Sequence, residues 1–119
     1  MKRLVLFLVL LTLPLGTVGC AKKATAPVPG AINTFDSTTY RALMDAQAAI
    51  NSFKADVTSG KLPETPAIKT ALNQVISDYN AADQLYQAYH ASAGTTPQAP
   101  VQAAVTSLQT DINKLGAPQ

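Results

Sequence analysis

The chain has 119 residues, of which 47% are hydrophobic and 13% are charged, and its formal net charge is +2. This length allows one small domain and excludes a multidomain enzyme. The charged fraction is about half of the roughly 25% that is usual in globular proteins. With one cysteine, one histidine, one glutamate and no tryptophan, the sequence lacks the side chains for most catalytic constellations.

The first twenty residues have the layout of an exported precursor. A short cationic start (MKR) precedes the almost wholly apolar run 4–18, which ends at Gly19 and Cys20. A charged start, an apolar stretch and a small residue before the cleavage point are typical of a signal peptide. The alternative, a transmembrane helix, needs about 20 apolar residues, whereas this run has fifteen and is interrupted by a proline and a glycine. We therefore expect a cleaved signal peptide over residues 1–19.

The end of this run, Thr17-Val18-Gly19-Cys20, resembles the lipobox of bacterial lipoproteins. The resemblance covers residues 1–20 and implies that Cys20 carries a thioether-linked diacylglycerol and an added acyl chain. It also implies that signal peptidase II cleaves between Gly19 and Cys20. The family prefers leucine three residues before the cysteine, where this chain has Thr17. The alternatives are a free or buried thiol at Cys20.

A lipidated Cys20 would hold the mature chain to a membrane surface, because two or more buried acyl chains give stable anchoring. Ala21 is not the aspartate that the family links to retention in the inner membrane. The resemblance therefore implies the outer membrane, facing the periplasm, in a double-membraned bacterium. In a single-membraned bacterium it implies the outer face of the plasma membrane.

Residues 20–35 are expected to form a flexible tether, because prolines, a glycine and small residues occur there without a helical period. Lys22 and Lys23 would lie beside the lipid. They either contact anionic headgroups or simply keep a flexible segment soluble.

Residues 36–119 are expected to form a helical bundle, because their apolar residues recur at helical spacing. Asp36 or Ser37 would cap the first helix, and Thr65 and Thr96, each followed by proline, would open the next two. The short connections predict an all-α, up-down-up antiparallel three-helix bundle, although the same spacing fits an oligomeric coiled coil. The expected helices are residues 37–59, 66–92 and 98–115, each to within a few residues.

Three tyrosines of the second expected helix are the most unusual feature of this region. At their spacing, tyrosines usually belong to a core and direct their hydroxyls to its edge. The functional alternative is an aromatic face that receives a partner helix or stacks on the sugar rings of a cell wall. The three residues are Tyr79, Tyr86 and Tyr89.

The remaining reactive side chains favour no catalytic role. The nearest acidic residue to His90 in the sequence is Asp83, about 10 Å away along a helix. We therefore expect a solvated or partly packed imidazole, no metal site, no cofactor and no enzymatic activity. The carboxylates are spread singly and are expected on the surface: Asp36, Asp45, Asp56, Glu64, Asp78, Asp83 and Asp111.

The charge balance after residue 19 disfavours nucleic-acid binding. Seven basic and seven acidic residues remain there, and residues 36–119 have five basic and seven acidic ones, so no basic stripe is left. The sequence predicts a small membrane-anchored lipoprotein that is a structural or protein-interaction module of the cell envelope. Its partner would be an envelope protein or a second copy. The alternative is an envelope ligand-binding module, for glycan or lipid, that uses the tyrosine face.

Overall fold

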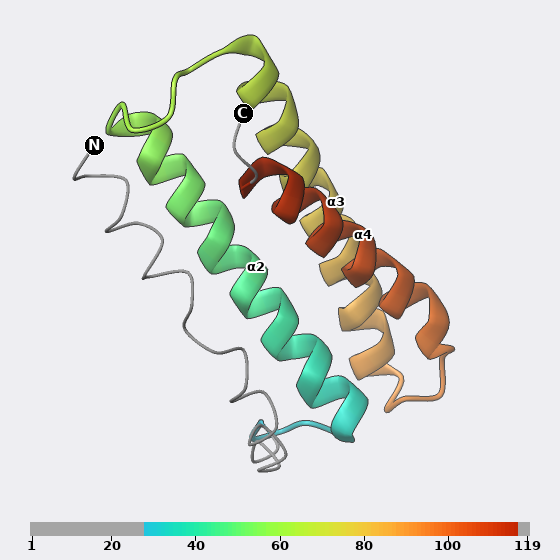
Figure 1. Ribbon diagram of the computed structural model, residues 1–119. Coiled ribbons are helices and arrows are strands. Elements are labelled where there is room, and N and C mark those ends of the chain that lie inside the picture. The colour runs from blue at the N-terminus through green and yellow to red at the C-terminus, as the bar shows by residue number, and fades with distance from the viewer. Residues whose placement is uncertain (1–27, 117–119) are drawn as a thin grey trace, which may run out of the picture.

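The computed structural model describes residues 28–116, which form three α-helices joined by short connections. The helices are α2 (Thr34–Thr58), α3 (Pro66–Ala91) and α4 (Gln98–Gly116). Helices that follow each other in the chain run in opposite directions (Figure 1). This arrangement confirms the predicted up-down-up three-helix bundle. The signal peptide and Cys20 lie outside the described residues.

The two ends of the bundle carry different parts of the chain (Figure 1). The end where the chain emerges from residue 27 holds the start of α2 and the α3–α4 connection, residues 92–97. We call it the tether end. The far end holds the α2–α3 connection, residues 59–65, and the end of α4.

Helix α2 begins earlier than the sequence indicated, and a different residue caps it. The Oδ1 atom of Asn33 accepts a hydrogen bond from the backbone N–H of Asp36 at 2.9 Å. Asn33 is therefore the N-cap, and the expectation that Asp36 or Ser37 caps the helix is wrong. The carboxylate of Asp36 reaches back to accept from the N–H of Ile32 at 3.0 Å. This two-way arrangement is a variant of the capping box, with an acidic residue three positions after the cap.

The start of α3 and the ends of the helices follow the predicted signals closely, whereas α4 begins at Gln98 and leaves both Thr96 and Pro97 outside the helix. The hydroxyl of Thr65 accepts from the N–H of Ile68 at 3.2 Å, and Pro66 occupies the first position of α3. Helix α2 stops at Thr58, and Gly60 follows with a φ of +78°, a conformation that glycine adopts at little cost. Helix α3 ends at residue 91 and α4 at residue 116, each within one residue of the expected boundary.

The core consists of the predicted apolar stripes, which meet along the bundle axis. Ala46 and Ala82 are buried among larger side chains, and their small size allows neighbouring helices to approach closely. Tyr40 and Met44, one helical turn apart beside the stripe of α2, remain 39% and 48% exposed. The buried members of the central cluster are Leu43, Ala46, Ile50, Val75, Ala82, Leu108 and Leu115.

The hydropathy of the described residues identifies no membrane-spanning helix. Across residues 28–116, no helix combines the length and the apolar character that crossing a bilayer requires.

Candidate functional site

Eight residues that the sequence analysis assigned to the tether, 28–35, form part of the folded domain, and the last two of them are the first residues of α2. The N–H of Val28 donates to the hydroxyl of buried Ser37 at 2.9 Å, and the N–H of Ala31 closes a turn onto the carbonyl of Val28 at 3.0 Å. Residues 28–33 therefore pack against the start of α2, and the chain enters the bundle at a fixed point.

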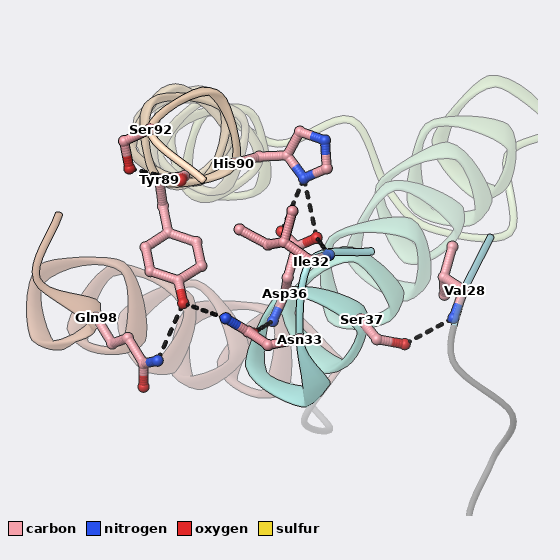
Figure 2. Close-up of polar contacts among 9 residues, drawn as sticks. All are labelled: Val28, Ile32, Asn33, Asp36, Ser37, Tyr89, His90, Ser92 and Gln98. Carbon is pink, nitrogen blue, oxygen red and sulfur yellow. Dashed lines mark hydrogen bonds and ion pairs between the residues drawn. The ribbon is translucent and has the colours of Figure 1, made fainter. Parts of the chain in front are cut away.

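The carboxylate of Asp36 is the centre of the tether end. Its side chain is completely buried, although the sequence analysis expected it on the surface. It accepts from the N–H of Ile32 and from Nδ1 of His90, which lies 2.9 Å from Oδ2 and 3.0 Å from Oδ1 (Figure 2). Burial of a charge costs several kcal/mol unless it is paired and hydrogen-bonded. Asp36 satisfies this condition by joining the start of α2 to the end of α3.

His90 is oriented by this contact. An ionised carboxylate only accepts hydrogen bonds, so Nδ1 carries the hydrogen in this pair. The second ring nitrogen, Nε2, is turned away from Asp36 (Figure 2), and the side chain is 44% exposed. A partly packed imidazole agrees with the sequence analysis, but its acidic partner lies 54 residues away in the chain.

Tyr89 makes a second set of polar contacts at the tether end. Its side chain is fully buried, and its ring meets that of Phe35 edge-on with centroids 5.1 Å apart. Its hydroxyl accepts from Nδ2 of Asn33 at 2.8 Å and from Nε2 of Gln98 at 3.0 Å (Figure 2). Tyr89 therefore links the entry of α2, the end of α3 and the start of α4. It takes no part in an exposed aromatic face.

An open pocket of about 260 Å³ adjoins the Asp36–His90 pair. Residues 28–31 line it together with Tyr40 and Tyr86, whose ring centroids are 6.3 Å apart. The imidazole of His90 lies 5.9 Å from the ring of Tyr86. We call this the tether-end pocket. It combines two aromatic rings and an oriented imidazole.

The pKa values of two tyrosines reflect this environment. Burial raises the pKa of Tyr86 to about 12, and the charge of Asp36, together with its hydrogen bond to the phenol, adds to the shift. Burial also raises the pKa of Tyr79, to which the charge of Asp83 contributes. Both effects disfavour the phenolate. Tyr86 therefore serves the pocket as a neutral hydroxyl and an aromatic surface.

The far end brings together two carboxylates that the sequence places singly. Burial and a hydrogen bond to Asp111 raise the pKa of Asp78, whereas hydrogen bonds to Lys114 and to Asp78 lower the pKa of Asp111. Such opposite shifts are expected of two carboxyls that share a proton. The Nζ atom of Lys114 lies 2.8 Å from Oδ1 of Asp111, and this lysine supplies the compensating charge.

A third surface lies between α2 and α4, where an open pocket of about 260 Å³ carries no charged side chain. Its apolar lining residues are Phe35, Ala42 and Val105, and the others are threonine and glutamine. Cores of protein–protein interfaces are similarly depleted of charge. We call it the α2/α4 groove; its residues are Phe35, Thr38, Thr39, Ala42, Gln102, Val105, Thr106 and Gln109.

The described residues contain no group of three or more His, Cys, Asp or Glu side chains that could hold a metal ion. Their buried side-chain nitrogen and oxygen atoms all have hydrogen-bond partners. The polar network of the tether end is thus complete without a bound group.

The sequence analysis missed the Asp36–His90 pair and the contacts of Tyr89. One signal was present: Asn33 and Asp36 have the spacing of a capping box, which indicates an earlier helix start. In an antiparallel bundle, the start of α2 then lies beside the end of α3. That reasoning would have placed Asp36 and His90 at the same end, although not in contact.

The comparisons with known proteins give no relatives for this chain: no family model, no curated protein and no solved structure matches it.

Proposed function

We propose that this chain is a bacterial lipoprotein, anchored through lipid on Cys20, whose three-helix bundle is a structural or protein-interaction module of the cell envelope. The apolar run and the Thr17-Val18-Gly19-Cys20 pattern support the anchor. The uncharged α2/α4 groove supports the interaction role, because a partner can cover it without desolvating an unpaired charge. The proposal assigns no catalytic activity and no cofactor to the chain.

The anchor is tested by replacing Cys20. The Cys20→Ser variant is expected to accumulate as an unprocessed precursor and to lose metabolic labelling with fatty acid. A variant with a changed neighbour, Ala21→Ser, keeps the cysteine and should be processed and labelled. Continued labelling of the Cys20→Ser protein would contradict the anchor.

The interaction role is tested by photo-crosslinking in the native envelope. A photoreactive residue in place of Thr106, which is exposed and lines the groove, should give an adduct of defined mass. The same residue in place of Thr70, which is exposed on α3, serves as the matched control. An adduct of twice the chain mass would identify self-association. Equal or absent crosslinking at both positions would contradict the groove as the docking site.

The tether-end pocket favours a second candidate function, the binding of a small envelope ligand such as a glycan or a lipid headgroup. Two aromatic rings at an open pocket can stack on a sugar ring, and the imidazole of His90 can hydrogen-bond to it. Cell-wall glycan fragments should then change the tyrosine fluorescence of the protein. The Tyr86→Ala variant should abolish the change and Tyr86→Phe should retain most of it. An unchanged titration with the Tyr86→Ala variant would exclude this pocket.

A further inference from the structure

The large apolar side chains exposed on the described bundle are distributed unevenly along its axis. Four large hydrophobic side chains are prominently exposed, and all of them lie in the half next to the tether. Ile32 precedes α2, Tyr40 lies on its second turn, and Met44 lies near its middle, about 15 Å along the axis from its start. Their exposures are 40%, 39% and 48%. Leu85, at 39%, lies in the last third of α3. The half at the far end has no comparable group among the described residues.

Charged residues have the opposite distribution. The half of the bundle at the far end carries eight of them: Lys54, Asp56, Lys61, Glu64, Lys69, Asp78, Asp111 and Lys114. The half at the tether end carries Arg41, Asp45, Asp83 and the buried Asp36, besides His90. The run of residues 92–110, which includes the α3–α4 connection, has no charge at all. The tether end is therefore the end that loses least free energy when it leaves bulk water.

The position of the expected lipid anchor indicates that the tether end lies near the membrane. Val28 follows Cys20 by eight positions, and a fully extended chain of that length covers at most about 29 Å. Val28 is itself fixed to the bundle through its hydrogen bond to Ser37. Helix α3, with 26 residues, is about 39 Å long. The tether end consequently lies within reach of the bilayer, whereas the far end is kept close to it only if the bundle lies flat.

From these observations we infer that the bundle rests on the membrane interface through its tether end, with Ile32, Tyr40 and Met44 in contact with lipid and the far end directed away. The inference rests on the proposed lipidation of Cys20. Tyrosine suits this position, because its ring is apolar and its hydroxyl remains at the level of the headgroups. The described residues of this end supply no basic cluster, so their own contact with lipid is apolar. The residues that line the α2/α4 groove do not include these three side chains.

The test uses the full lipidated chain in protein-free phosphatidylcholine vesicles. Cys20 is the only cysteine and is consumed by lipid, so an introduced cysteine is the only free thiol. Thr95→Cys places a fluorescent label in the α3–α4 connection, and Lys61→Cys places one in the far loop; both positions are exposed. Lipids with a nitroxide near the headgroup should quench the label at position 95 strongly and the label at position 61 weakly.

A second variant ties the contact to the named side chains. Adding Met44→Glu should lower quenching at position 95 toward the level at position 61. Ser52→Glu, at an exposed position of the same helix, introduces the same charge and should leave quenching unchanged. Circular dichroism checks that each variant keeps its helical content.

Separate measurements distinguish failure of the lipid anchor from failure of the inferred orientation. If the chain does not float with the vesicles and carries no lipid on Cys20, the anchor fails, and the inference fails with it. If the chain floats but positions 95 and 61 are quenched equally or not at all, only the inference about orientation is overturned. Shielding of position 95 in envelope membranes but not in protein-free vesicles would show a protein at this surface and would also overturn it.

Discussion

The two ends of the bundle are held together in different ways. At the tether end, His90 meets Asp36 and Tyr89 meets Asn33, pairs that are 54 and 56 residues apart in the sequence. The ion pairs of the far end join residues that are close in sequence: Lys61 with Asp56, Lys69 with Glu64, and Lys114 with Asp111, at 3.5, 2.9 and 2.8 Å. The Asp78–Asp111 carboxyl pair is the exception, since it joins α3 and α4.

This difference shows which polar contacts can fix how the helices align. An exposed ion pair contributes about 0–1 kcal/mol, and a pair within one helix or loop does not discriminate between arrangements of the helices. A buried group that loses its partner destabilises the fold by about 1–3 kcal/mol. The buried contacts of Asp36 and Tyr89 therefore specify the alignment at the tether end. At the far end, the helices are held together mainly by apolar packing.

The largest effect is expected from Tyr89→Ala. Removing a fully buried aromatic side chain should lower the free energy of unfolding by about 3–5 kcal/mol, as measured by urea denaturation. Tyr89→Phe keeps the ring beside Phe35 but leaves the amide donors of Asn33 and Gln98 without their acceptor. It should cost about 1–2 kcal/mol. Equal losses in the two variants would mean that the hydroxyl, not the ring, dominates.

The variants Asp36→Ala and Asp56→Ala compare the stability contributions of one carboxylate at each end. Asp36→Ala removes the acceptor of His90 and of the Ile32 N–H and should cost about 2–3 kcal/mol. Asp56→Ala removes a partly exposed carboxylate of the far end, 3.5 Å from Lys61, and should cost about 0–1 kcal/mol. Chemical denaturation of the two variants under the same conditions gives the comparison. Similar losses would refute the distinction between the ends.

Two glycines with the same backbone conformation sharpen the comparison. Gly60 and Gly94 both have a φ of +78°, so alanine at either position should cost about 1 kcal/mol through strain. A Cβ atom at residue 94 would also lie 3.2 Å from the Tyr89 hydroxyl and 3.3 Å from Nδ2 of Asn33, whereas nothing lies within 4 Å at residue 60. Gly94→Ala should therefore cost about 2 kcal/mol. Thermal unfolding monitored by circular dichroism should rank Gly94→Ala below Gly60→Ala.

The smallest effect concerns high pH. The pKa of Tyr86 rises to about 12 in the folded protein, from an ordinary value of 10.0. The unfolded chain thus loses this proton first, so the free energy of unfolding should fall as pH rises from about 10 to 12. The Tyr86→Phe variant should show a shallower fall in denaturation measured over this range. An identical slope in both proteins would contradict the assignment of the raised pKa to Tyr86.

Local signals in the sequence determined most of the fold. Apolar residues at helical spacing identified the three helices, because one face of each must be buried. The Thr65-Pro66 pair and Gly60 marked helix ends, because caps and left-handed glycines act within a few residues. The start of α2 was misplaced because the periodic apolar residues begin after its first turn, which Asn33 and Asp36 organise instead.

Only the tertiary structure decided the role of the polar residues. The sequence gives no sign that Asp36 is buried or that His90 is its partner, because the contact depends on how α2 and α3 align. It also cannot separate Tyr89 from Tyr86, which share one helical stripe. The fold buries Tyr89 between three segments and leaves Tyr86 at an open pocket. Helical periodicity fixes which face of a helix is apolar, whereas the burial of each residue depends on where the neighbouring segments end.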